Sequence, residues 1–172
     1  MTNLEAFIRD IPDFPKPGIV FKDITPLLGD GGAFKAAIDQ LGETLADVEY
    51  DAVVGIESRG FLFGAALALA QGKGFVPIRK PGKLPYETVS REYALEYGTD
   101  KVEMHKDAVS AGQSVVVVDD LIATGGTATA ACELIEDLGA RVAALGFVIA
   151  LDFIPWKDRL GDRDVRALLR YS

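Results

Sequence analysis

Residues 115–127 read Val-Val-Val-Val-Asp-Asp-Leu-Ile-Ala-Thr-Gly-Gly-Thr, and they constrain the fold more than any other part of the chain. Four consecutive valines are typical of a strand covered on both faces, as in a parallel sheet. Because adjacent carboxylates are costly to bury, we expect Asp119 and Asp120 to lie where this strand emerges at its carboxyl end. Ligands of open α/β sheets bind at that edge. The segment therefore predicts a parallel α/β fold with a polar site after this strand.

The loop after these acids has a composition that suits an anion. Two hydroxyls surround two glycines, and a helical pattern follows at once; the residues are Ala123, Thr124, Gly125, Gly126 and Thr127. Glycines let backbone N–H groups converge on an anion, and a helix N-terminus adds partial positive charge. Asp, Thr and Gly-Gly also occur in ordinary caps and turns. The ordered combination favours a ligand that carries both phosphate and sugar hydroxyls. It is neither a Walker P-loop, which has a Lys after the second Gly, nor a Rossmann fingerprint.

Length and single residues narrow the class of protein. The 172 residues suffice for one domain with its own core, so we expect residues 1–172 to form a single domain. Cys132 is the only cysteine, which excludes an intrachain disulfide and gives no zinc-site spacing; we expect it in the core. His105 is the only histidine and is expected on the surface.

Charge and hydropathy argue against two classes of partner. The net charge is −8, and no cluster of basic residues offers phosphate contacts, so nucleic-acid binding is not expected. The first residues lack the basic and apolar regions of a signal peptide. The longest apolar stretches, such as 60–70, fall well short of the roughly 20 residues of a membrane span. We therefore expect a cytoplasmic protein without a membrane partner.

The remaining elements alternate between strands and helices, which predicts a doubly wound sheet. The apolar residues of 4–11 have helical spacing, with Pro12 ending that helix, and 12–29 resembles an irregular arm with four prolines. The expected core elements are a helix at 34–45 starting near Asp30, strand 52–56, a helix to about 70, strand 75–78, strand 114–118, helix 128–138, and strand 142–151, which closes the sheet. Residues 80–101 indicate a functional loop or a β excursion that contains a strand at 93–97.

A second polar loop, Glu57-Ser58-Arg59-Gly60, follows strand 52–56 at a helix start. Arg59 offers a planar, charged fork that suits phosphate oxygens. A solvated arginine is the alternative, but the helix dipole disfavours an unpaired cation at a helix start, which favours an anionic partner. Phe14 and Phe21 suit either a core or a stacked ligand, and the residues alone leave both open. Glu96 alone suits a solvated strand face.

Residues 115–127 resemble the phosphoribosyl-pyrophosphate (PRPP) binding motif of type I phosphoribosyltransferases. Four further segments narrow the resemblance to the members of that family that act on adenine: 11–26, 57–64, 78–85 and 95–98. The resemblance runs from about residue 4 to 151 and weakens after Leu151. It implies an α/β type I phosphoribosyltransferase fold, in which helices flank a central parallel sheet. It also implies a small N-terminal hood at about 12–29 and a flexible lid loop at about 80–101.

The resemblance implies transfer of the phosphoribosyl group from PRPP to adenine, giving AMP and pyrophosphate. Mg²⁺ would be held mainly by PRPP, pyrophosphate and water, and the protein would be a homodimer. Residues 123–127 would wrap the 5-phosphate, Asp119 and Asp120 would face the ribose hydroxyls near the metal, and Glu96 would be the general acid/base at N7 of adenine.

The resemblance assigns the other site residues to three groups. The loop Glu57, Ser58, Arg59 and Gly60 would hold pyrophosphate through a cis peptide. The hood residues Val20, Phe21 and Lys22 would cover the base, with Phe21 packed on it, and Tyr97 belongs to the same base site. Arg79 and Lys83 would reach the pyrophosphate of a neighbouring subunit. Two other functions stay open: transfer to another purine base, and a non-catalytic PRPP-sensing regulator, which would need a DNA-binding module or a basic face.

Overall fold

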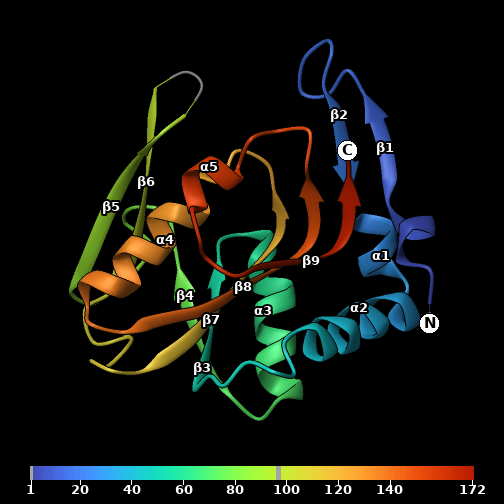
Figure 1. Cartoon of the computed structure of the whole chain (residues 1–172). Coiled ribbons are helices and arrows are strands. Elements are labelled where there is room, and N and C mark those ends of the chain that lie inside the picture. Colours follow the sequence, from blue (N-terminus) through green and yellow to red (C-terminus); the bar gives the residue numbers. More distant parts are fainter. Residues whose placement is uncertain (1, 96–97) are drawn as a thin grey trace.

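The computed structural model describes residues 2–95 and 98–172. Its centre is a five-stranded parallel sheet in the order β4-β3-β7-β8-β9 (Figure 1). The strands are β3 (Ala52–Ile56), β4 (Gly74–Ile78), β7 (Ser114–Ile122), β8 (Arg141–Leu151) and β9 (Val165–Tyr171). The expectation of a parallel α/β sheet is confirmed.

Helices cover both faces of this sheet, and the valine run of β7 explains why both faces are needed. Val116 and Val118 pack in one core with α2 (Gly31–Thr44) and α3 (Arg59–Ala70). Val115 and Val117 pack in the other core, with α4 (Gly126–Asp137). Successive side chains of a strand point to opposite faces, so an all-apolar strand buries both sets.

The helices begin and end near the expected positions. Asp30 caps α2, because its Oδ1 accepts a hydrogen bond from the backbone N–H of Ala33 at 2.8 Å. Cys132 is fully buried in α4, as expected. Within residues 2–95 and 98–172, no helix is long and apolar enough to cross a membrane.

The N-terminal segment differs from its prediction. Instead of a helix through Ile11, one 3-10 turn, η1 (Leu4–Phe7), leads into the strand β1 (Arg9–Pro12). This strand pairs antiparallel with β2 (Val20–Asp23), with Ile11 opposite Phe21. The expected irregular arm is therefore a hairpin followed by the short helix α1 (Thr25–Gly29). Long-range pairing with β2 outweighs the local helical spacing.

Residues 80–101 belong largely to a β excursion. The strands β5 (Thr88–Ala94) and β6 (Thr99–His105) form an antiparallel hairpin, with Tyr93 opposite Asp100. A single bridge between Arg79 and Glu103 joins this hairpin to the end of β4. The strand expected at 93–97 was misplaced, because β5 begins at Thr88 and ends at Ala94. Glu96 and Tyr97 lie outside the described residues.

The C-terminal part adds elements that the sequence did not suggest. Strand β8 does not close the sheet, because β9 pairs parallel to it along its outer side after the short helix α5 (Lys157–Leu160). The sequence does not predict β9 because arginines interrupt the apolar pattern of this strand. The side chain of Arg166, for example, pairs with Asp164 and Asp47 and donates to the Thr44 carbonyl.

Candidate functional site

Asp119 and Asp120 lie at the carboxyl end of the central strand, but still within it. The carboxyl end is where the sequence predicts them, but the predicted strand end at 118 is wrong, because β7 continues to Ile122 alongside β8. Asp120 is only 3% exposed. Its burial is compensated by Arg59 from the start of α3, whose Nε lies 2.9 Å from Asp120 Oδ2. Two polar loops far apart in sequence therefore meet at one sheet edge.

The electrostatics of this acid pair follow from burial and from mutual repulsion. Burial raises the pKa of Asp119 well above its ordinary value, and the neighbouring charge of Asp120 raises it further. Burial also raises the pKa of Asp120, while the Arg59 guanidinium opposes that rise. Asp120 Oδ2 is buried and makes no hydrogen bond, despite the nearby Arg59. The two neighbouring carboxylates thus share the positive charge of Arg59.

The glycine loop after these acids has the geometry of an anion cradle. Gly125 has φ of 79°, a conformation that favours glycine, and α4 begins at the next residue. The loop lines a cavity of about 130 Å³; the lining residues are Asp119, Phe147, Leu121, Ile122, Ala123, Thr124, Gly125, Gly126, Thr127 and Ala128. The cavity thus places one of the acids beside the helix N-terminus.

The loop 57–60 is held by charges from the segment after β4. The peptide bond between Glu57 and Ser58 is cis, as the resemblance implied. Glu57 Oε2 accepts from the backbone N–H of Lys80 at 2.8 Å and from Arg79 Nε at 3.3 Å, and Lys83 pairs with Oε1. Burial alone would raise the pKa of Glu57, but these contacts lower it.

Gly60 lets this loop approach the central strand. A Cβ at that position would lie 2.7 Å from Asp119 Oδ1 and 2.9 Å from the Val118 carbonyl oxygen. Glycine is therefore required for the first turn of α3 to pack against β7. This contact brings the loop of Arg59 to the acid pair.

The hood hairpin reaches the same region through Phe21. The Arg59 guanidinium lies 5.3 Å from the centre of the Phe21 ring, and Phe14 meets that ring edge-on at 5.2 Å. Lys22 pairs with Asp10 across the hairpin at 2.6 Å and lies over the Tyr171 ring at 3.8 Å. Phe21 is only half-buried, and its contact with Arg59 connects the hairpin to the loop 57–60.

Most of the residues expected at the site lie near this sheet edge. The described residues add two that sequence reasoning missed. The Trp156 carbonyl lies 3.2 Å from the point where a Gly125 Cβ would lie. Glu103 accepts from the backbone N–H of Gly82, between Arg79 and Lys83, at 3.2 Å. Neither residue belongs to a local motif, so no sequence signal marked them.

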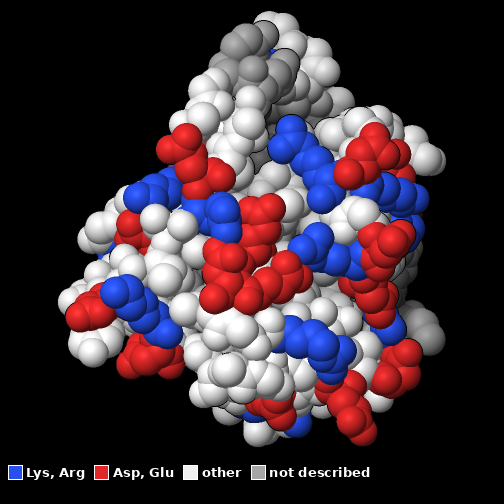
Figure 2. All heavy atoms as spheres, turned by 60° about the vertical axis from the view of Figure 1, so that its left-hand side comes forward, with Lys and Arg blue, Asp and Glu red and all other residues white. Residues whose placement is uncertain are grey.

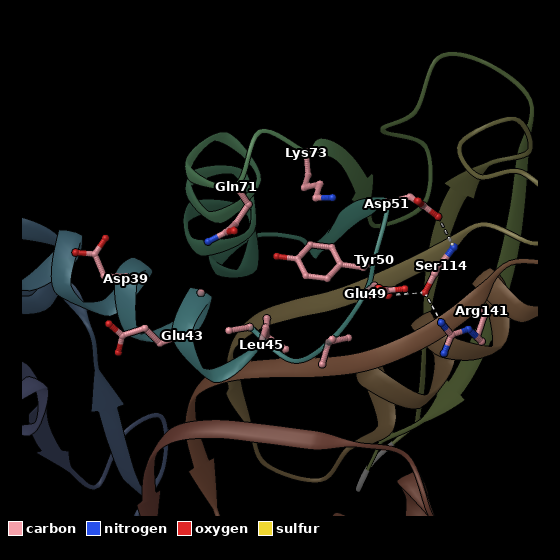
Figure 3. A pocket seen from close by; sticks show the side chains of 13 residues that line it. Asp39, Glu43, Leu45, Glu49, Tyr50, Asp51, Gln71, Lys73, Ser114 and Arg141 are labelled. Carbon is pink, nitrogen blue, oxygen red and sulfur yellow. Dashed lines mark hydrogen bonds between the residues drawn. The ribbon is translucent and has the colours of Figure 1, made fainter.

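A larger cavity lies elsewhere in the molecule. It measures about 1020 Å³ and opens at the amino ends of the strands, between α2, the end of α3, β7 and β8 (Figure 3). Tyr50 lies in its middle, with Glu43 on one side and Asp51 and Arg141 on the other. None of the residues expected at the site lines it. The glycine loop lies at the opposite edge of the sheet, where parallel α/β sheets bind their ligands.

Surface charge is mixed on the face shown in Figure 2, where basic and acidic side chains alternate without a continuous basic patch. Ion pairs between neighbouring elements account for part of this pattern. Arg91 of β5, for example, pairs with Glu133 and Asp137 of α4. This face therefore lacks the continuous basic surface that binds the phosphate backbone of a nucleic acid.

Comparison with known proteins agrees with this geometry. The family model "phosphoribosyl transferase domain" matches residues 28–153. An adenine phosphoribosyltransferase of Thermotoga sp. (strain RQ2) is 54% identical over 169 residues, covering 98% of this chain and 99% of the relative. That of Solibacter usitatus is 55% identical over 172 residues, covering 100% and 99% of the two chains. The chain belongs to the adenine phosphoribosyltransferase family.

Solved structures of this family have the same fold. The adenine phosphoribosyltransferase of Thermoanaerobacter pseudethanolicus superposes with a TM-score of 0.96 at 52% identity, covering 98% of each chain. That of Saccharomyces cerevisiae, in complex with an imino-altritol bisphosphate and adenine, superposes at 0.90 with 46% identity, covering 96% of each. The family likeness therefore extends past Leu151, where the sequence pattern had weakened, and includes α5 and β9.

Proposed function

We propose that this protein transfers the 5-phosphoribosyl group of PRPP to adenine, forming AMP and pyrophosphate. Beyond family membership, one observation carries the proposal: the contact between Arg59 and Asp120 brings the loop 57–60 to the acids and glycine loop of β7. PRPP carries a 5-phosphate, a ribose and a pyrophosphate in fixed order. The glycine loop, the acid pair and the loop 57–60 provide three neighbouring sites of matching chemistry.

In the proposed reaction, the N9 lone pair of adenine forms a bond to C1 of the ribose. The bond from C1 to the pyrophosphate oxygen breaks, and its electron pair leaves with pyrophosphate. Positive charge builds on the ribose ring, which Asp119 and Asp120 stabilise electrostatically. Glu96 takes the N7 proton of adenine as the base becomes positive. The hood residues Val20, Phe21 and Lys22 cover the base and exclude water.

The acid pair fits a magnesium ion that is held mostly by the substrate. No group of three or more His, Cys, Asp or Glu side chains in residues 2–95 and 98–172 could hold a metal. Asp120 Oδ2, however, is buried without a hydrogen bond, and Asp119 lies beside it. Mg²⁺ keeps waters and substrate oxygens and needs few protein ligands. Asp119 and Asp120 would hold it, and when bound it would neutralise charge on the pyrophosphate.

We also propose that the protein is a cytoplasmic homodimer. The outer face of α3 is apolar, with Leu62 44% exposed, Ala65 exposed and Leu69 84% exposed at positions one and two turns apart. Such a face beside the edge strand β4 suits a second copy of the chain. Arg79 and Lys83 follow β4 directly, on the side where a partner's pyrophosphate would lie.

Sedimentation velocity tests the dimer. Leu69→Glu combined with Leu62→Glu should give a monomer, whereas Phe153→Glu, a change at a residue whose exposure (62%) lies between those of the two leucines, should leave the dimer intact. A wild-type monomer at micromolar concentration would contradict the proposal.

The test of the function is an initial-rate panel of purine bases with PRPP and Mg²⁺. Adenine should give AMP, with much lower kcat/KM for hypoxanthine and guanine, and EDTA should abolish turnover. Comparable kcat/KM for hypoxanthine would favour a transferase for another base. No turnover with any base, together with PRPP binding, would favour the regulator.

A further inference from the structure

Tyr93 occupies a junction between the two substrate loops. It lies in β5, opposite Asp100 in β6, and its hydroxyl donates to Asp100 Oδ2 at 3.0 Å. Lys80 donates to the same hydroxyl at 3.0 Å and pairs with the Asp100 carboxylate. Hydroxyl, ammonium and carboxylate thus form a closed, half-buried triangle near the end of the hairpin where β5 passes into β6.

One end of this triangle leads to the pyrophosphate loop. Lys80 follows Arg79, and its backbone N–H donates to Glu57 Oε2 at 2.8 Å. Glu57 is the first residue of the loop 57–60. Because Lys80 holds Glu57, a displacement of Lys80 would move Glu57 and with it the start of that loop.

The ring of Tyr93 packs against Gly126, next to the proposed phosphate loop. Its Cδ2 lies 3.3 Å from the position that a Cβ at Gly126 would occupy, and the carbonyl oxygen of Ala94 lies 3.5 Å from the same point. Gly126 is the first residue of α4, beside the phosphate cradle. Most side chains at position 126 would push the ring away, so this glycine serves the ring contact as well as the anion.

We propose that Tyr93 is a positioning residue that fixes the β5–β6 hairpin relative to both substrate loops. In the sequence it precedes Glu96, the proposed acid/base, by three residues. When the phosphate of the ribose lies in the glycine loop, the attached base can meet Glu96 only in a narrow range of positions. A displacement of the reacting groups by about 1 Å can lower the rate up to ~100-fold. This inference rests on the proposed transferase activity.

Two substitutions separate the two contacts. Tyr93→Phe removes the hydroxyl and leaves the ring on Gly126, so kcat should fall roughly tenfold while the KM for PRPP changes less than about twofold. Tyr93→Leu also removes the ring, so the KM for PRPP should rise as well. Tyr86→Phe is the matched control, because Tyr86 lies in the same segment, is 61% exposed, and contacts neither loop.

The split between kcat and KM separates positioning from a merely structural role. A structural residue would change stability and both constants together, so thermal unfolding is measured for each variant. The inference would be overturned if Tyr93→Phe left both kcat and the KM for PRPP within twofold of wild type. It would also be overturned if Tyr93→Phe and Tyr93→Leu changed these two constants equally. A wild type that forms no AMP would instead contradict the proposed function, and the inference with it.

Discussion

Arg59 Nε lies 2.9 Å from Asp120 Oδ2, although the two residues belong to different strand–loop–helix units. This pair joins the loop that follows β3 to the end of β7, and it explains how a carboxylate that is 3% exposed can lie within a parallel strand. Under the proposed function each residue would have two roles, because Arg59 and Asp120 stabilise each other in the fold and would also face the substrate.

The double substitution Asp119→Asn with Asp120→Asn should remove most catalysis without unfolding the protein. Neutral amides remove both causes of the raised pKa of Asp119, the burial of a charge and the repulsion by Asp120, so the melting temperature should not fall by more than a few degrees. Loss of electrostatic stabilisation of the ribose ring should lower kcat at least ~100-fold. Calorimetry and single-turnover rates check both parts, and a near-wild-type rate would make these acids structural only.

Arg59→Ala should weaken the handling of PRPP and pyrophosphate more than that of adenine. It removes a cation beside the pyrophosphate loop and leaves Asp120 buried without its partner, which we expect to cost about 1–3 kcal/mol of stability. Product-inhibition constants for pyrophosphate and the KM values for both substrates measure the difference. Unchanged PRPP kinetics in a folded variant would remove Arg59 from the site.

Gly125→Ala should damage the phosphate loop specifically. The residue has φ of 79°, where a side chain costs about 1–2 kcal/mol, and the new Cβ would lie 3.2 Å from the Trp156 carbonyl oxygen. Gly112→Ala is the matched control, because it has φ of 81° with nothing within 4 Å. We expect both variants to lose stability in thermal melts, but only Gly125→Ala to raise the KM for PRPP.

Glu57 should make stability depend on acid pH. Its contacts with Lys83 and Lys80 lower the pKa in the folded state below the ordinary 4.5, so the stabilisation is fully present above pH 4.5. It is lost as pH falls through the lower, folded-state value. Glu57→Gln should therefore be less stable than wild type at pH 7, with a difference that shrinks below pH 4.5. Denaturant unfolding at several pH values, with Glu87→Gln as an exposed control, tests this; a gap constant with pH would contradict it.

Glu96→Gln should lower kcat at least ~100-fold with little change in PRPP affinity. The amide keeps the size of the side chain but cannot accept the N7 proton. Glu92→Gln, a change of an exposed acid in β5, should have almost no effect. A fall of less than threefold, with chemistry shown to limit the rate by single turnover, would exclude Glu96 as the acid/base.

The sequence predicts most of the sheet because its signals there are local. The valines of β7, the cap at Asp30 and the glycines at 125 and 126 each act within a few residues, and the structure has them where the patterns indicate. The hairpin β1–β2 and the strand β9 were missed for the opposite reason. The pairing of Ile11 with Phe21 depends on the conformation of all the residues between them. Arg166 of β9 pairs with Asp47, which is far away in the sequence. The position of Asp120 inside its strand depends equally on a distant partner, Arg59.

The contact between Lys22 and the Tyr171 ring joins residues from nearly opposite ends of the chain. During synthesis, the hairpin that carries Phe21 leaves the ribosome early, whereas β9 emerges last. A nascent chain can thus complete its phosphate loop before the support for its base cover exists. Contacts of such long sequence separation form late and slow the folding of a domain. In a newly made molecule, the support of the hairpin β1–β2 by β9 should therefore form later than the loop 123–127.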